Sequence, residues 1–287
     1  MTTATATMPA ATERRPANPA AKAVRAVPTL TKRRLQLSLQ SPRAVLVPLA
    51  APVLFALVIA PALANAVAPG PGRTAYMTFI ALSTAGLLIP MNCLFSGLGV
   101  IVDRQQGAMR ELMVAPIRRS SIVFGNLVAA VILTAFQVVV LVVASDLRGA
   151  NYTFGVRTLW FVGAALVFSI LMYGLAEILT VRMPSPVEYM GAVPAMAIIP
   201  FFLAGSLFPI TAMPAWLAAV AKVLPVTQAL ALFRYGITGP AGVSALHNIW
   251  GLHDATTMAL LSMAVLVLYA LVFVNGAIRL FTKAGTS

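Results

Sequence analysis

The chain has 287 residues, of which 60% are hydrophobic and only 9% are charged, and its formal net charge at pH 7 is +13. A soluble globular domain carries about 25% charged residues, so this composition argues against a soluble protein and for an integral membrane protein. The apolar runs are too long and too continuous for barrel strands of about 10 alternating residues, so we expect an all-α membrane protein.

The chain begins with a polar stretch, residues 1–30, that is rich in Ala, Thr and Pro and carries scattered basic residues. Its apolar content is too low for folding, so we expect residues 1–30 to be a disordered basic cytoplasmic tail and residues 31–287 to form the transmembrane domain. Lys32, Arg33 and Arg34 precede alternating leucines and predict a short interfacial helix. The long polar lead favours an uncleaved anchor over a signal peptide.

Six apolar runs follow, each long enough to cross a membrane as a helix of roughly 20 residues. Turn signals rich in Pro and Gly separate several of them, most clearly at residues 69–72 and 183–186. The expected spans are residues 44–67, 76–102, 122–145, 158–181, 189–208 and 255–280.

The basic residues decide the orientation of these spans. If the N-terminus is cytoplasmic, 15 of the 20 Lys and Arg residues lie on the cytoplasmic side. Positive residues accumulate on that side of membrane proteins, so we expect both termini to be cytoplasmic. Because most basic residues flank apolar runs, they indicate contacts with membrane lipids rather than with nucleic acid. The five outer residues are Arg73, Arg148, Arg157, Lys222 and Arg234.

The charged segment 103–119, DRQQGAMRELMVAPIRR, separates the second span from the third. A polar helix held between two spans cannot be buried in lipid, so it must lie at the membrane surface. A helix over residues 106–115 would place Met109, Leu112 and Met113 on one face. We interpret this segment as the contact with a separate partner protein; the alternative is an ordinary cytoplasmic loop whose basic residues fix the topology.

The segment 209–239, between the fifth and sixth spans, is too often broken by proline for a span and too apolar for an ordinary loop. Backbone at membrane depth must be helical or covered by protein, so we expect two short helices that re-enter the outer leaflet. Pro214 suits the first turn of one helix, and Trp216 suits the aromatic belt at a membrane interface.

Two stretches resemble the ABC-2 family of ABC-transporter permeases, in the branch of daunorubicin-resistance exporters. They cover residues 103–125 and 205–234, although Gln105, Ala108 and Asn126 stand where the family usually has Glu, Thr and Lys. The resemblance implies a cytoplasmic coupling helix formed by Asp103, Arg104, Gly107, Met109, Arg110, Glu111, Leu112, Pro116 and Arg118. It also implies an extracellular gate formed by Gly205, Phe208, Pro209, Pro214, Trp216, Pro225 and Arg234.

The same resemblance implies one half of an exporter that pairs with a second permease subunit, as a homodimer or a heterodimer, and with an ABC ATPase subunit. This chain has no Gly-rich P-loop motif, so we expect it to bind no cofactor and not to be an enzyme. ATP and Mg would then be bound by the partner. The mostly apolar spans favour a hydrophobic or amphipathic cargo such as a drug, natural product, lipid or glycolipid. The high Ala, Pro and Arg content suggests a GC-rich bacterial genome and therefore a bacterial plasma membrane, and the resemblance implies a role in antibiotic resistance.

Two polar residues inside the spans are further candidates. Glu177 would serve a proton relay in a secondary transporter driven by an ion gradient, which is the alternative function; otherwise it pairs with Arg182 or a neighbouring span. Asn92 would line a conduit or form a hydrogen bond between helices. His247 and His253 lack further ligands at metal-binding spacing, so we expect no metal site.

Overall fold

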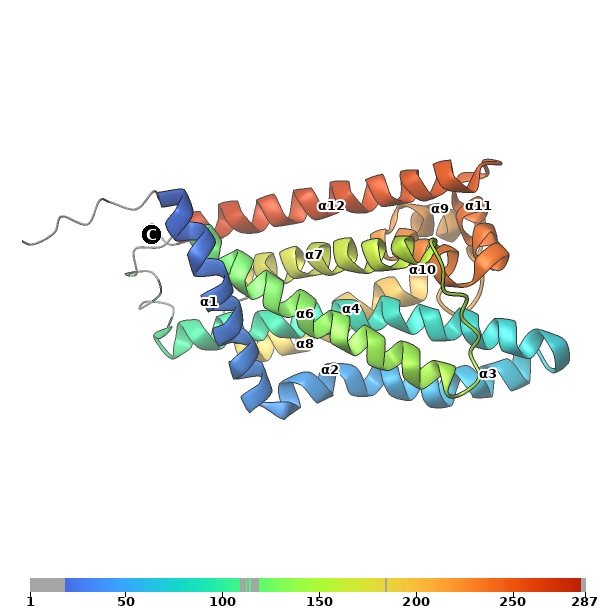
Figure 1. Cartoon of the computed structure of the whole chain (residues 1–287), viewed down its shortest axis with the longest axis horizontal. Coiled ribbons are helices and arrows are strands. Elements are labelled where there is room, and N and C mark those ends of the chain that lie inside the picture. Colours follow the sequence, from blue (N-terminus) through green and yellow to red (C-terminus); the bar gives the residue numbers. More distant parts are fainter. Residues whose placement is uncertain (1–18, 109–111, 113, 115–118, 184, 285–287) are drawn as a thin grey trace, which may run out of the picture.

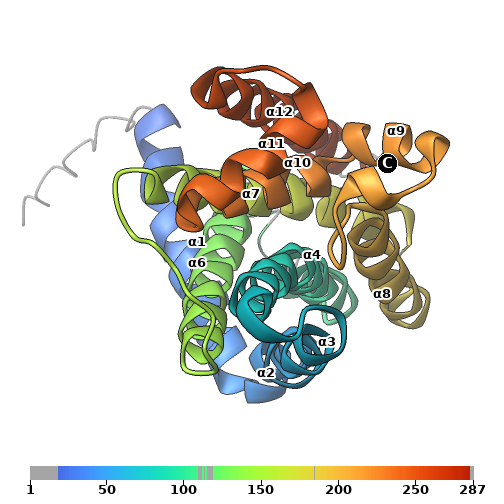
Figure 2. The ribbon, with the colours of Figure 1, turned by 90° about the vertical axis from the view of Figure 1, so that its right-hand side faces the viewer.

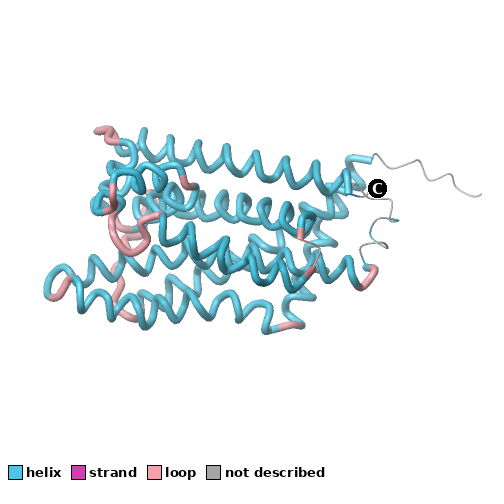
Figure 3. The backbone as a smooth tube through the Cα atoms, turned by 180° about the vertical axis from the view of Figure 1, so that it is seen from behind, coloured by secondary structure: helices cyan, strands magenta, loops and turns pink. Residues whose placement is uncertain are grey.

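A computed structural model describes residues 19–108, 112, 114, 119–183 and 185–284. Within these ranges all regular secondary structure is helical, which confirms the all-α prediction (Figure 3). Six long helical segments run lengthwise through the molecule, with another helix across one end and shorter helices gathered at the other (Figure 1).

The six lengthwise segments coincide with the predicted spans. The first consists of α2 (Pro42–Leu54), a π-helical turn (Phe55–Ile59) and α3 (Ala60–Val67). The others are α4 (Arg73–Gln105), α6 (Arg119–Asp146), α7 (Thr158–Arg182), α8 (Pro186–Leu203) and α12 (Ala255–Ala284). Within the described ranges these six are long and apolar enough to cross a membrane, so the chain is a multi-pass membrane protein.

Helix α4 is the central helix of the bundle. In its most apolar window 72% of the residues are buried, against 22% for the first span and for α8. It packs against α2, α6, α7 and α8 along its length, and the end-on view shows it enclosed by these neighbours (Figure 2). It also packs against the shorter helix α10 (Pro225–Ile237). A small residue permits this contact, since a Cβ added at Gly86 would lie 2.7 Å from Leu230 of α10.

Helix α1 (Pro19–Gln40) crosses one end of the bundle and packs against α6, beside the end of α12 (Figure 1). A Cβ added at Gly125 of α6 would lie 2.6 Å from Leu30, and Thr31 Oγ1 donates a hydrogen bond of 3.1 Å to the Gly125 carbonyl. We expected disorder up to residue 30, whereas the helix begins at Pro19, and its residues Leu30 and Thr31 contact α6. The rest of the expected tail, residues 1–18, lies outside the described residues.

Shorter helices cover the opposite end of the bundle (Figure 2). The two short helices expected within residues 209–239 correspond to α9 (Ala215–Val223) and α10, and their re-entry into the outer leaflet stays a prediction. Helix α11 (Val243–Trp250) follows outside that segment, and 3-10 turns lie at Ile210–Ala212 and Gly239–Gly242. Helices α9 and α10 meet at an angle of 80°. The fifth span ends at Leu203 rather than at the expected residue 208, because Gly205 turns the chain at a φ of +74°.

Candidate functional site

The C-terminal end of α4 is fixed to α1 by an ion pair. Asp103 is buried there, and its two carboxylate oxygens lie 3.4 Å from Arg33 Nη2 and 3.2 Å from Arg34 Nη1. Arg34 Nη2 also donates a hydrogen bond of 2.9 Å to the Ser96 carbonyl. Gly99 makes room for this guanidinium, since a Cβ there would lie 1.8 Å from Arg34 Nη2. The last turns of α4 are therefore fixed to α1 just before the chain leaves α4.

The predicted coupling segment begins at this ion pair. Arg104 donates a hydrogen bond of 3.2 Å to the Thr180 carbonyl of α7, so the start of the segment contacts a second span. Gly107 adopts a φ of +80° beyond the end of α4. Leu112 is partly buried and packs against the core. The predicted coupling residues Met109, Arg110, Glu111, Pro116 and Arg118 lie outside the described residues, so the helix itself remains a prediction.

The buried carboxylate of Glu177 lies in α7, toward the same end of the bundle. Glu177 is 2% exposed, and Tyr173, one turn earlier, donates a hydrogen bond to Oε1; Oε2 has no hydrogen-bond partner. The expected pairing with Arg182 is wrong, because these two residues form no ion pair and Arg182 is exposed. Positions five apart lie on different faces of a helix, whereas positions four apart are neighbours.

Asn92 connects two spans. Its Nδ2 donates a hydrogen bond of 2.5 Å to Thr134 Oγ1 of α6, and the thiol of the adjacent Cys93 donates to the Ser169 carbonyl of α7 at 3.5 Å. Both residues are buried. Of the two predicted roles for Asn92, the structure therefore supports the hydrogen bond between helices.

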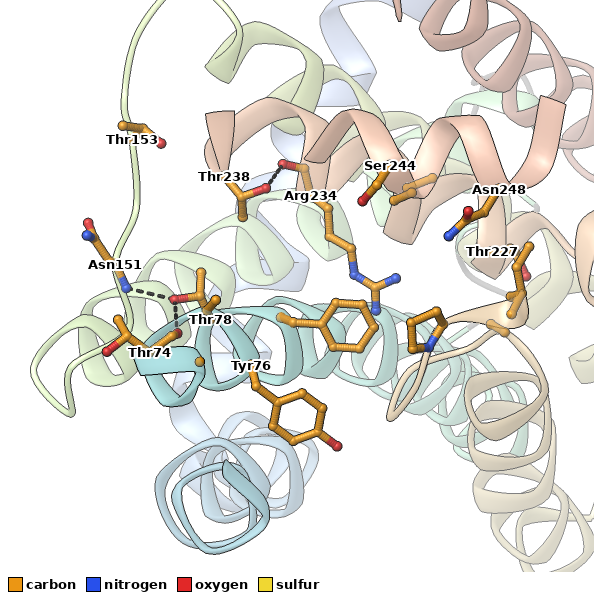
Figure 4. Close-up of a pocket in the computed structure, with 18 of the residues that line it drawn as sticks. Thr74, Tyr76, Thr78, Asn151, Thr153, Thr227, Arg234, Thr238, Ser244 and Asn248 are labelled. Atoms are coloured by element: carbon orange, nitrogen blue, oxygen red, sulfur yellow. Dashed lines mark hydrogen bonds between the residues drawn. The ribbon is translucent and has the colours of Figure 1, made fainter. Parts of the chain in front are cut away.

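A cavity of about 690 Å³ lies at the opposite end, around the N-terminal turns of α4 (Figure 4). Helices α10 and α11 form one side of it, and the loops 147–157 and 204–209 contribute to its wall. Its polar lining residues are Thr74, Tyr76, Thr78, Asn151, Thr153, Thr227, Arg234, Thr238, Ser244 and Asn248.

Hydrogen bonds hold the two loops against the helices. The Asn151 amide donates to Thr78 Oγ1 at 2.9 Å, and the Thr153 amide donates to the Ile237 carbonyl at 2.9 Å. Tyr76 donates its hydroxyl to the Leu207 carbonyl at 2.9 Å. Between the two loop contacts, burial raises the pKa of the Tyr152 phenol to about 12, although its hydrogen bond to Ser145 acts in the opposite direction. These hydrogen bonds to α4 and α10 therefore fix the loops that form the wall of the cavity.

Arg234 of α10 reaches across this cavity to α4. Its Nη2 donates hydrogen bonds to Ser83 Oγ at 2.7 Å and to the Gly205 carbonyl at 3.1 Å. Its Cζ atom lies 3.6 Å from the centroid of the Phe79 ring, within cation–π distance. The side chain is buried, with 8% of the residue exposed, and a guanidinium stays protonated even in such a place.

The predicted gate residues fall into three groups in the structure. Gly205, Pro209 and Arg234 meet at the cavity. Phe208 and Trp216 lie on the surface, 47% and 71% exposed. Pro214 precedes α9 and Pro225 begins α10. Proline is tolerated at both positions because the backbone N–H that it lacks would have no partner within the helix. The sequence analysis did not identify the hydroxyl and amide groups of the lining, because they come from segments far apart in the sequence.

Comparisons with known proteins agree with this architecture. The family model described as ABC-2 type transporter matches residues 25–238. The chain is similar to the "Putative transport permease ycf38" of Porphyra purpurea, with 27% identity over 164 residues, and to the protein of the same name from Pyropia yezoensis, with 26% identity over 167 residues. Each match covers 57% of this chain and 56% of the relative, so the chain spans about half the length of the relatives it matches.

Proposed function

The chain belongs to the ABC-2 type transporter family, and from this premise we propose that it is the permease subunit of an ATP-driven exporter. The ATP would be hydrolysed by a separate ABC ATPase subunit, with ATP and Mg bound there, and a second permease subunit would complete the transport pathway. We propose a hydrophobic or amphipathic cargo, because the spans are mostly apolar.

The observation that carries this proposal is the course of α4. This helix runs for 33 residues without interruption, a length of about 50 Å at the usual rise per residue. One end is bonded to α1 through Asp103 and opens into the segment 106–118, and the other end contributes Thr74, Thr78 and Phe79 to the cavity. A force applied to the segment would therefore reach the cavity along one central helix.

The basic residues support the orientation that this mechanism needs. The end crossed by α1 holds Arg33, Arg34 and Arg104, and the segment that follows α4 adds further arginines. A bacterial plasma membrane with this end on the cytoplasmic side would place the segment where an ATPase can bind it. The cavity would then face the outer side, where an exporter releases its cargo.

The test is reconstitution in liposomes together with the proposed ABC ATPase subunit, using rhodamine 123 as the transported probe. We expect ATP-dependent movement of the dye that Glu111→Arg lowers roughly tenfold or more, because reversing a charge at a docking surface costs several kcal/mol. Asp146→Arg makes the same charge reversal on an exposed residue at the opposite end and serves as the matched control.

The same experiment also tests the alternative function, a secondary transporter driven by an ion gradient. Glu177 is a buried carboxylate with one oxygen lacking a hydrogen-bond partner, and an ionisable group inside a span is a candidate for proton transfer. Dye movement by this chain alone, driven by a pH gradient without ATP and lost in Glu177→Gln, would replace the exporter proposal. ATP-dependent movement that is unchanged in Glu177→Gln would assign this carboxylate a structural role.

A further inference from the structure

Arg234 is a buried cation that the protein does not neutralise. Among the described residues the ion pairs join Asp103 to Arg33 and Arg34, and none involves Arg234. No Asp or Glu in the described part of the chain lines its cavity. Burying a charge without an opposite charge is costly, so a cation kept in such a place favours any anion that can reach it.

The hydrogen-bonding capacity of this guanidinium is only partly used. It carries five N–H donors, and its two hydrogen bonds to protein are both made by Nη2. Its buried Nε has no partner. Unpartnered buried donors are uncommon in proteins because each costs free energy, and an oxyanion that accepts from Nε would remove that cost.

A second unpartnered group lies on the same helix. Thr227 is 3% exposed, lines the cavity, and has a buried hydroxyl oxygen without a hydrogen-bond partner. Thr227, Ala231 and Arg234 all line the cavity at spacings of four and three residues, which places them along one face of α10. The small side chain of Ala231 leaves space between the two polar groups, so a bound molecule could extend from the guanidinium toward the hydroxyl.

The size and polarity of the cavity fit the head of an amphipathic molecule. Figure 4 shows Arg234 extending from α10 toward α4, with Ser244 and Asn248 on α11, whereas Asn151 and Thr153 lie farther from the guanidinium. Phe79, Ile210 and Ile249 give the same cavity an apolar surface. A volume of about 690 Å³ exceeds what a bare inorganic anion needs and lies within the range of ligand pockets.

The carboxylates at this end of the molecule do not compete for Arg234. Asp254 caps the start of α12, where it accepts hydrogen bonds from the Thr256 and Thr257 amides and from the Thr257 hydroxyl. These hydrogen bonds lower the pKa of Asp254. Asp146 is exposed at the end of α6 and does not line the cavity.

We infer that this cavity binds the oxyanion of an amphipathic molecule, a phosphate or a carboxylate, at Arg234, with a hydroxylated head extending along α10 toward Thr227. The anion would come from a membrane lipid or from a free solute, and the experiment below distinguishes the two. Binding of this kind needs no ATPase and no transport, so it can hold even if the export proposal fails.

The test measures binding to the purified full chain in an uncharged detergent, by the shift of its thermal unfolding temperature. The variants are Arg234→Lys, which keeps the charge but loses the planar set of donors, and Asn248→Asp, which places a carboxylate in the lining with almost no change of shape. The control is His253→Asp, which adds a carboxylate at an exposed position outside the cavity at the same end. Asn248→Asp leaves Arg234 and its hydrogen bonds in place, so the test does not rest on one variant that could unfold.

The probes are dioctanoyl-phosphatidylglycerol, uncharged dioctanoylglycerol and inorganic phosphate. We expect saturable stabilisation by the phosphatidylglycerol in the unmodified chain and in His253→Asp, weakened about tenfold or more in Arg234→Lys and Asn248→Asp. Equal stabilisation by inorganic phosphate would identify a free anion as the source, and stabilisation by the lipid alone would identify a headgroup. The inference is overturned if the uncharged lipid stabilises as well as the anionic one, if neither anion stabilises, or if Asn248→Asp binds like the control.

Discussion

Two arginines with largely buried guanidinium groups contact helix α4, one near each of its ends. Arg34 contacts the last turns, where it bonds to Ser96 and Asp103, and only 11% of its side chain is exposed. Arg234 contacts the first turns, where it lies over Phe79 and bonds to Ser83. Both cations come from other helices, so each one ties a second helix to α4.

The two arginines differ in what balances their charge. Arg34 faces a carboxylate, and that pair leaves little for a ligand to gain. Arg234 faces an aromatic ring, a hydroxyl and a carbonyl, which are weaker partners that leave the positive charge in place. Burial alone therefore does not assign a role to an arginine. The arginine paired with a carboxylate suits a structural contact between helices, and the one without a carboxylate suits an anion-binding site.

The substitution Asp103→Asn should have the largest effect on stability. It removes the charge that balances Arg33 and Arg34 and leaves two neighbouring cations, one of them largely buried. Breaking a buried pair on one side costs about 3–5 kcal/mol, and the partial exposure of Arg33 lowers our expectation to about 2–4 kcal/mol. The measurement is the free energy of unfolding in mixed micelles with increasing sodium dodecyl sulfate.

Asp146→Asn is the matched control for this prediction, since it makes the same change on an exposed residue at the other end of the bundle. We expect it to change the free energy of unfolding by less than about 0.5 kcal/mol. Equal losses in the two variants would mean that the ion pair at Asp103 does not hold α1 to α4, and the contrast between the two arginines would disappear.

The sequence predicted the spans closely because each is a long apolar run that ends at glycine, proline or charged residues. It did not predict how far α1 extends, because that helix depends on a close contact with Gly125 of α6. For Arg234 it predicted the outer side of the membrane, and the family resemblance implied a place in the extracellular gate. The burial of this side chain and the lack of a carboxylate beside it arise when α4, α10 and the loop after α8 come together.

Gly99→Ala should have an intermediate effect, because it disturbs the paired arginine without removing a charge. The new Cβ would occupy the place of Arg34 Nη2, so the guanidinium must move and lose its bonds to Ser96 and Asp103. Asp103 keeps Arg33, so we expect a loss of about 1–2 kcal/mol in the same unfolding measurement.

Gly191→Ala is the control for this substitution, because it lies within helix α8 and a Cβ there meets no atom within 4 Å. Alanine favours a helix over glycine by about 1 kcal/mol, so this variant should be neutral or slightly more stable. In an Arg34→Met background the cost of Gly99→Ala should vanish, since the displaced group is gone. A cost that persists there would place the strain elsewhere on α4.

Arg234→Met should have the smallest effect on stability, although it removes a side chain that is just as deeply buried. No carboxylate is left without its partner, and Ser83 keeps a hydrogen bond of 2.8 Å to the Phe79 carbonyl. Only the Gly205 carbonyl loses a donor, which lowers stability, whereas removing the uncompensated charge raises stability. We therefore expect a change of less than about 1 kcal/mol in either direction, against a clear loss for Arg34→Met. A loss as large as that of Asp103→Asn would show that the weak partners of Arg234 together hold the two helices as firmly as an ion pair does. The charge of Arg234 would then be needed for folding. The two arginines would have different partners but the same structural role.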